Sequence, residues 1–302
     1  VKALLKATTD RASPFADCQI TAVDQRIDLL PSHSALSCIA GSFADPVLLA
    51  LCLEQEADLV FHLAAVPSGL CEQNPELGLA VNVQGTLQLL NALRAQNRQA
   101  TMIFASSIAV YGKPVVDCVT DDTAPTPTLS YGAHKVIGET LVNDYVRRGW
   151  VSGCALRLPG IVARPPEPNG AISIFFSDLI RQLAMGKSCT CPVSAEARSW
   201  LMSVSVCVDN LLYAATHTFD SRRIFMLPAQ YVQLGELVDA IGRVTGQADI
   251  SNRIVWAPDP WVEFNFGTYP PLDLPLAEAQ GFRADSSLDT MVKSSLLTAM
   301  SD

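Results

Sequence analysis

The feature that most constrains the fold of this chain is the regular alternation of short apolar runs and helical segments from residue 18 onward. "ADLVFHLAA" (57–65) and "ATMIFASS" (100–107) are near-continuous apolar runs, as expected for strands that are covered on both faces. Between them, residues 76–96 carry apolar side chains at helical spacing. Repeated strand–helix units of this length predict an α/β fold, a parallel sheet doubly wound by helices and linked by right-handed crossovers.

The same rhythm continues up to about residue 160. It predicts further strands at 18–24, 36–43 and 152–160, and helices at 45–55 and 130–149. We therefore treat residues 1–160 as one domain.

The rhythm changes in the Pro-rich segment "VARPPEPNG" (162–170). The remaining pattern predicts helices at 171–185, 206–217, 233–245 and 286–299, with short strands near 200–204, 224–227 and 252–256. We expect residues 161–302 to form a smaller α+β lobe that is interwoven with the first domain.

Composition limits the partners and the compartment. The 302-residue chain carries a formal net charge of −9, which argues against nonspecific binding to nucleic acid or to anionic membranes. No apolar run approaches the ~20 residues that span a bilayer. Its nine cysteines include no C-x-x-C pair, and none of its four histidines has ligand spacing to them. We expect a cytoplasmic protein with free thiols, no metal, and a small-molecule substrate.

Two short motifs point to chemistry. "SSIAVYG" (106–112) follows a predicted strand, and "SYGAHKV" (130–136) opens a predicted helix. In doubly wound sheets, ligands bind at the carboxyl ends of the strands. Tyr131 and Lys135 are four residues apart and share one helix face, so the ammonium group can stabilise a phenolate whose ordinary pKa is about 10. With Ser107 as a donor to the substrate oxygen, this set suits removal of an alcohol proton while a hydride leaves the same carbon.

Five stretches occur together in one order: "ADLVFHLAA", "VNVQGT", "FASSIAVYG", "YGAHK" and "LRLPG". In these the chain resembles the extended short-chain dehydrogenase/reductase superfamily, which contains the NAD-dependent epimerases and dehydratases. The resemblance covers residues 18–160 and, more loosely, the C-terminal lobe. It implies a Rossmann-type NAD-binding domain over 1–160 and a substrate-binding lobe over 161–302.

The resemblance also implies roles for single residues. Tyr131 would exchange the proton, Lys135 would bond the nicotinamide ribose and lower the pKa of Tyr131, and Ser107 would orient the substrate. Ser106 would face the cofactor, and Asn82 would support the active-site helix and a proton-relay water. The full set of expected cofactor-binding residues is Asp24, Ser42, Phe43, Leu63, Ala64, Ala65, Asn82, Ser106, Tyr131, Lys135 and Pro159.

The choice of cofactor depends on Asp24, which ends a predicted strand. An acid there accepts from the adenine-ribose 2′-OH and favours NAD over NADP, although a strand-terminal Asp also starts ordinary turns. The Gly-rich loop that holds the pyrophosphate in this superfamily does not occur in the chain, and we expect it to precede "VKALLKA".

The reaction is less constrained than the fold. Dehydratases of the superfamily need an acidic pair where this chain has Ile108 and Ala109. The stretch from "LRLPGIVARPP" to "RSWLMSVSVCVDN" resembles superfamily members that use NAD to oxidise the C2 hydroxyl of a four-carbon sugar acid to a 2-oxo acid. Residues expected at the substrate are Ser68, Ser107, Tyr131, Asn169, Ser173 and Arg198. A turn position for Asn169 and a surface position for Arg198 remain open alternatives.

Two other functions stay open. A nucleoside-diphosphate-sugar 4-epimerase is one, since Arg198 and Asp209 of the epimerase pattern are present. A non-catalytic dinucleotide-sensing regulator is the other, although such proteins typically lack the Tyr or the Lys. We also expect a homodimer through helices 76–96 and 130–149, with Val142, Tyr145 and Val146 at the contact unless they face the chain's own sheet.

Overall fold

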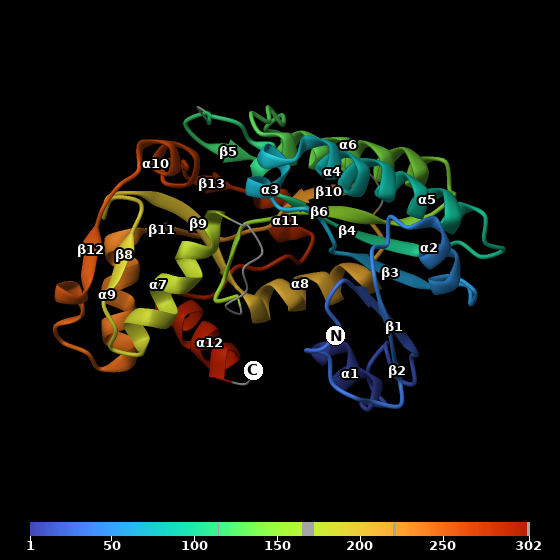
Figure 1. Cartoon of the computed structure of the whole chain (residues 1–302), viewed down its shortest axis with the longest axis horizontal. Coiled ribbons are helices and arrows are strands. Elements are labelled where there is room, and N and C mark those ends of the chain that lie inside the picture. The colour runs from blue at the N-terminus through green and yellow to red at the C-terminus, as the bar shows by residue number, and fades with distance from the viewer. Residues whose placement is uncertain (114, 165–171, 220–221, 301–302) are drawn as a thin grey trace.

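The computed structural model describes residues 1–113, 115–164, 172–219 and 222–300, and it consists of two lobes (Figure 1). The larger lobe contains a four-stranded parallel sheet in the order β10–β6–β4–β3. Its strands are β3 (Leu59–His62), β4 (Thr101–Ser107), β6 (Ser152–Leu158) and β10 (Ile224–Met226). Helices α4, α5 and α6 cover one face of this sheet and α8 covers the other (Figure 1), which confirms the predicted Rossmann-type α/β fold.

Strand β4 shows why the apolar runs form buried strands. Met102 and Phe104 pack on the side of α5 and α6, whereas Ile103 packs on the opposite side with Trp200. Burial on both faces requires apolar side chains at consecutive positions. Gly153 in β6 has φ +111° and lies so close to the Met102 carbonyl that a side chain would collide with it.

The helix predicted over 76–96 is divided. It consists of α4 (Pro75–Leu79), the π-helical turn η1 (Ala80–Gly85) and α5 (Thr86–Arg94), and α3 (Ser68–Gln73) precedes it. Asn74 caps α4, because its Oδ1 accepts from Leu77 N at 3.1 Å. A π turn places one extra residue in the helix, and here it holds Asn82 inward.

The first strands form a separate sheet. β1 (Ile20–Asp24) pairs in parallel with β2 (Leu36–Ala40), near α1 (Lys2–Thr8). The predicted strands at 18–24 and 36–43 are therefore correct, but no strand among the described residues connects β1 to β3, so the predicted single sheet is in two parts. The helix predicted at 45–55 is α2 (Pro46–Cys52), with Asp45 accepting from Val47 N at 2.8 Å as its N-cap.

The smaller lobe is built on a three-stranded sheet in the order β11–β9–β7 and a two-stranded pair, β8 with β12. The strands are β7 (Gly160–Val162), β8 (Cys189–Cys191), β9 (Arg198–Ser203), β11 (Gln230–Gln233) and β12 (Ile254–Trp256). The helical elements are η3 (Ile172–Ile174), α7 (Phe175–Ala184), α9 (Leu234–Thr245), η4 (Ile250–Arg253), α10 (Pro260–Phe266) and α12 (Leu288–Met300). Helix α11 (Pro275–Ala279) packs in the larger lobe through Ala277. An apolar cluster that includes Leu179, Leu237 and Met291 holds α7, α9 and α12 together.

The chain passes between the lobes more than once. It leaves β6 at Pro159, which has no N–H for a sheet ladder, and enters the second sheet at β7. It then returns, since α8 (Val204–Thr216) and β10 pack in the first lobe. β13 (Leu272–Asp273) pairs with β5 (Val119–Thr120) of the first lobe. These crossings keep the two sheets close, with the carboxyl end of β6 at the junction.

The residues proposed for a dimer contact lie inside the protein. Val142 and Tyr145 of α6 (Ser130–Arg147) are buried in the cluster between α5 and the sheet, and Val146 packs against it. The Tyr145 hydroxyl donates to Asn91 Oδ1 at 2.7 Å. These side chains face the chain's own core, so that assignment is corrected, and the homodimer itself stays a prediction.

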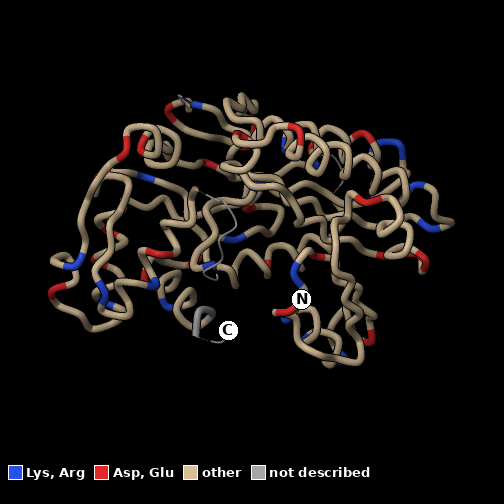
Figure 2. The backbone as a smooth tube through the Cα atoms, viewed as in Figure 1, with Lys and Arg blue, Asp and Glu red and all other residues tan. Residues whose placement is uncertain are grey.

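The charge distribution, the helix lengths and the positions of possible metal ligands bear on the sequence-based expectations. Acidic and basic residues are interspersed over both lobes (Figure 2). Within the described part of the chain, the helices are too short or too polar to cross a bilayer, and no three His, Cys, Asp or Glu residues gather as metal ligands.

His62 lies at the end of β3 and is a core histidine. Its Nε2 lies 2.9 Å from Thr86 Oγ1, and its ring packs between Phe43 and Phe104. Burial, with a smaller contribution from the charge of Lys135, lowers the pKa of His62 to about 3. The imidazole is therefore neutral in the folded protein at pH 5–8.

We expect His62 to make the fold sensitive to acid. In the unfolded chain the imidazole takes up a proton below its ordinary pKa of about 6.5, and in the folded chain only near pH 3, so its contribution to stability falls as the pH drops through 6.5. Between pH 7.5 and 5.5 this amounts to about 1.4 kcal/mol of unfolding free energy. Urea titrations of the wild type and of His62→Gln at both pH values measure it. Equal losses in the two proteins would contradict the assignment.

Candidate active site

The end of β4 and the start of α6 meet at the junction of the lobes. After β4 the chain forms the short turn η2 (Ile108–Val110), in which Ser107 Oγ accepts from Ala109 N at 3.1 Å. Gly132 lies against the Ala109 carbonyl, where a side chain would collide with the backbone. This close approach places Tyr131, in the first turn of α6, next to Ser107. The predicted proximity of these two residues is therefore present in the structure.

The phenol of Tyr131 is enclosed, and its surroundings act on its pKa in opposite directions. Burial raises the pKa to about 12. A hydrogen bond with Ser107 lowers it, the nearby Cys71 thiol raises it, and the Arg164 guanidinium lowers it. Burial dominates, so the phenol is protonated at neutral pH in this structure.

Lys135 lies one helical turn after Tyr131 and is buried. Its Nζ donates to the Ala105 carbonyl at 2.6 Å and lies 5.4 Å from the centroid of the Tyr131 ring. Burial lowers the pKa of Lys135 to about 8, against the opposing effects of Cys71 and Glu139. The sequence predicts that Lys135 lowers the pKa of Tyr131. In the structure Ser107 and Arg164 lower it, while the Lys135 ammonium group donates to the Ala105 carbonyl. The effect of Lys135 on Tyr131 therefore stays a prediction.

A buried polar network lies one further turn along α6. Glu139 accepts from Arg157 Nε at 2.9 Å and from Arg157 Nη2 at 2.8 Å, and Arg157 Nη1 donates to the Tyr111 hydroxyl at 2.8 Å. Ser106 Oγ also donates to Glu139. The sequence predicts that Ser106 faces the cofactor. In the structure its hydroxyl points instead into this network. Sequence reasoning missed Glu139 and Arg157, although Glu139 continues the Tyr131–Lys135 spacing by four residues.

The segment after β3 is the next part of the site. Asn82 holds it, because its Oδ1 accepts from Val66 N at 2.7 Å and its Nδ2 donates to the Val66 carbonyl at 2.9 Å. Leu63 and Ala64 are exposed and Ala65 is half-buried. The amide of Asn82 is therefore occupied in positioning an open, small-residue segment at the carboxyl end of the sheet.

Three predicted cofactor residues lie near the ends of β1 and β2. Asp24 is exposed at the end of β1, and its Oδ1 accepts from Arg26 N at 3.0 Å. Ser42 Oγ accepts from Ala44 N at 3.2 Å, and the Phe43 ring lies edge-on to His62 with the centroids 4.7 Å apart. This contact shows that Asp24 starts a turn, which is the alternative to a cofactor role named in the sequence analysis.

The predicted substrate residues are more dispersed. Ser68 is half-buried at the start of α3, and Ser173 lies in η3 next to Arg164. Arg198 is engaged within the smaller lobe, since its Nη2 donates to Gln233 Oε1 at 2.8 Å and its guanidinium lies 5.3 Å from the centroid of Tyr231. Asn169 lies outside the described residues.

Comparison with known proteins identifies the family. Residues 12–227 match the NAD dependent epimerase/dehydratase family. The chain belongs to this family. The D-erythronate dehydrogenase of Cupriavidus necator is 39% identical over 259 residues, which cover 84% of this chain and 80% of that protein. The D-erythronate dehydrogenase of Haemophilus influenzae is 35% identical over 245 residues, 80% of this chain and 78% of that protein. The prediction of an NAD-dependent oxidoreductase is confirmed.

A solved structure extends the comparison to the whole chain. The nucleoside-diphosphate-sugar epimerase from Agrobacterium tumefaciens superposes with a TM-score of 0.88 at 29% identity, covering 99% of this chain and 90% of that one. Similarity to proteins described as epimerase and as dehydrogenase means that family membership alone does not decide the reaction.

The residues of this epimerase/dehydratase family member fit a dinucleotide. Pro159 is buried where β6 ends, and Ala64 is exposed just after β3. Ser107 ends β4, and Tyr131 and the buried Lys135 lie in the first turns of α6, next to it. The Asp24 carboxylate is exposed at the same end of β1. These small residues, one acceptor and one cation suit the ribose units and the nicotinamide of a dinucleotide.

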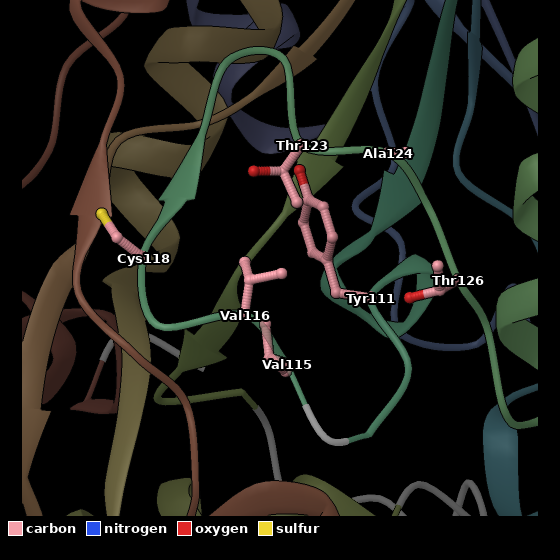
Figure 3. A pocket seen from close by; sticks show the side chains of 7 residues that line it. All are labelled: Tyr111, Val115, Val116, Cys118, Thr123, Ala124 and Thr126. Carbon is pink, nitrogen blue, oxygen red and sulfur yellow. The ribbon is translucent and has the colours of Figure 1, made fainter.

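A cavity of about 380 Å³ lies elsewhere, beside the connector that joins η2 to α6 (Figure 3). The Tyr111 ring projects into it toward Thr123 and Val116. Its lining consists of Tyr111, Val115, Val116, Cys118, Thr123, Ala124 and Thr126. Neither Tyr131 nor Lys135 lines this cavity, so we assign it no part in the chemistry.

Proposed function

We propose that this protein oxidises the C2 hydroxyl of a small sugar acid such as D-erythronate to the 2-oxo acid, with NAD as the hydride acceptor. The observation that carries the proposal is the Ser107–Tyr131 pair with the buried Lys135 one turn away. This arrangement serves proton removal from an alcohol, and the relatives at 39% and 35% identity are named for an alcohol oxidation of this class.

The chain's own residues divide the work. Ser107 orients the C2 hydroxyl, and the Tyr131 oxygen accepts its proton. NAD, when bound, supplies the carbon that takes the hydride. The pKa of Tyr131 is about 12 because the raising effect of burial exceeds the lowering effects of Ser107 and Arg164. Lys135, fixed by the Ala105 carbonyl, keeps a positive charge one turn from the reacting oxygen.

Asp24 supports the choice of NAD over NADP. Its exposed carboxylate at the end of β1 can accept from a ribose hydroxyl, whereas it repels a 2′-phosphate. In the proposed function Asp24 therefore acts at the adenosine end, and Tyr131 and Lys135 act at the nicotinamide end.

An epimerase is the second candidate, favoured by the superposition on the Agrobacterium tumefaciens epimerase. A regulator without catalysis is less favoured, because Ser107, Tyr131 and Lys135 are all present and Tyr131 is hydrogen-bonded to Ser107.

A substrate panel separates these candidates. Purified protein is incubated with NAD and with four- to six-carbon aldonates or UDP-sugars, while NADH absorbance and sugar products are followed. We expect NADH to form with D-erythronate or a related aldonate. Isomerisation of a UDP-sugar without net NADH would establish the epimerase, and dinucleotide binding without turnover of any member would establish the regulator.

A further inference from the structure

We propose that Arg164 binds the carboxylate of the sugar acid and gives the site its preference for an acid over a neutral analogue. The inference rests on the proposed function, because it names the residue that would recognise that substrate class. Arg164 was not among the residues that the sequence singles out.

The backbone of Arg164 is held firmly at the junction of the lobes. It lies two residues after β7, its N–H donates to Ser177 Oγ at 3.0 Å, and its carbonyl accepts from Arg181 Nη1. Both contacts come from α7. The guanidinium therefore projects from a fixed point between β7 and α7.

The guanidinium of Arg164 has an N–H donor without an acceptor in the described chain. Its Nη2 donates to Ser173 Oγ at 3.3 Å, but its buried Nε has no hydrogen-bond partner among the described residues. An arginine carries five N–H donors in a planar fork that matches the two oxygens of a carboxylate. A buried donor without an acceptor is unfavourable, so the arrangement favours an acceptor that arrives with a ligand.

No carboxylate of the described chain forms an ion pair with Arg164. Burial lowers the pKa of Arg164, and the charge of Asp178 only partly opposes this effect. The nearby Asp178 forms its ion pair with Arg181, and Arg164 takes part in none of the ion pairs among the described residues. Charges withdrawn from water are normally paired, and Arg164 is half-buried with a fully buried Nε. The anion that pairs with Arg164 is therefore expected from outside the described residues, which do not include Glu167. We infer that it is the substrate carboxylate, which has the right charge and shape.

Arg164 also lies close enough to the base for the two groups to affect each other. The guanidinium lowers the pKa of Tyr131, and Tyr131 in turn raises the pKa of Arg164. In a 2-hydroxy acid the carboxylate is bonded to the carbon that bears the reacting hydroxyl. A carboxylate-binding arginine within electrostatic range of Tyr131 suits recognition of this substrate class.

Arg198, the arginine expected from the sequence, fits this role less well. Its guanidinium already donates to Gln233 and stacks on Tyr231 within the β9–β11 pair. Arg164 combines an unfilled buried donor with proximity to Tyr131, and these are the two properties that the role requires.

The test compares an acid with its uncharged counterpart. For Arg164→Gln we expect kcat/KM with D-erythronate to fall about 10- to 100-fold, mostly through KM, because a charge-assisted hydrogen bond is lost. With D-erythronamide, whose amide carries no charge, we expect a smaller fall, because there Arg164→Gln removes only the effect of the guanidinium on Tyr131. The acid-to-amide ratio of kcat/KM should therefore drop about 10-fold. Arg164→Lys keeps the positive charge but loses the planar fork of donors. Its kcat/KM with D-erythronate should lie between those of the wild type and of Arg164→Gln. Arg243→Gln removes an exposed arginine paired with Asp289 and serves as the matched control.

Binding provides a second readout that needs no turnover. Calorimetric titration of D-erythronate and D-erythronamide into the protein with NADH measures the acid preference directly, and circular dichroism checks the fold of each variant. We expect the wild type to prefer the acid and Arg164→Gln to lose that preference. If Arg164→Gln does not fold, the same comparison is made with Arg164→Lys, where a reduced preference supports the inference and an unchanged one overturns it.

The outcomes separate the two proposals. A wild type that oxidises aldonates, with an acid-to-amide ratio unchanged by Arg164→Gln, overturns the role of Arg164 and leaves the proposed function standing. A wild type that isomerises UDP-sugars and binds D-erythronate no better than the amide overturns both.

Discussion

Replacing Tyr131 by Phe should lower kcat by about 10²- to 10⁴-fold, because it removes the hydroxyl that we propose takes the substrate proton on the Ser107 side of the site. The substitution keeps the ring that fills the enclosed space and deletes its hydroxyl. NAD binding should change little, since Lys135 is held by the Ala105 carbonyl and not by the phenol. Steady-state kinetics and a separate NAD titration measure the two effects.

Tyr145→Phe is the matched control. It removes a hydroxyl from the same helix, where Tyr145 donates to Asn91 in the α5–α6 contact. We expect it to cost about 1 kcal/mol of unfolding free energy and to leave turnover within about twofold. A Tyr131→Phe enzyme that keeps more than about a tenth of the wild-type kcat is incompatible with Tyr131 as the base.

The second large effect concerns stability. Arg157→Met should lower the free energy of unfolding by about 3–5 kcal/mol, because it leaves the Glu139 carboxylate buried without its guanidinium partner. The loss arises from the uncompensated charge and not from the strength of the pair. Adding Glu139→Leu should therefore recover at least half of the loss, since an apolar pair of similar volume often replaces a buried ion pair without penalty.

Urea unfolding of the three proteins tests this account. Arg98→Met is the control, because Arg98 pairs with Asp58 on the surface, where solvent screens the charges, and its unfolding free energy should stay nearly unchanged. A double variant as unstable as Arg157→Met would show that packing, and not the buried charge, causes the loss. The same variants report on the site, as Glu139 lies one turn beyond Lys135 on α6.

Much of the fold follows from local pattern. The run at 100–107 becomes β4 (Thr101–Ser107), and the helix at 130–149 becomes α6 (Ser130–Arg147), because uninterrupted apolar runs and helical spacing reflect burial that neighbouring residues share. The helix at 76–96 departs from its prediction at η1, where the inward turn of Asn82 toward Val66 favours a π turn. That contact joins residues 16 positions apart, so no helical periodicity reveals it.

The sequence by itself determined the α/β fold, the family and the spacing of Ser107, Tyr131 and Lys135, because these depend on short-range periodicity and on motifs read along one segment. Tertiary structure decided which polar groups are occupied. It turned Ser106 toward Glu139 and engaged Arg198 with Gln233. It left the buried Nε of Arg164 unpartnered in the described chain. Hydrogen-bond partners and burial come from segments far apart in the sequence. These long-range contacts raise the pKa of Tyr131 and leave free the Arg164 donor that we propose for the substrate.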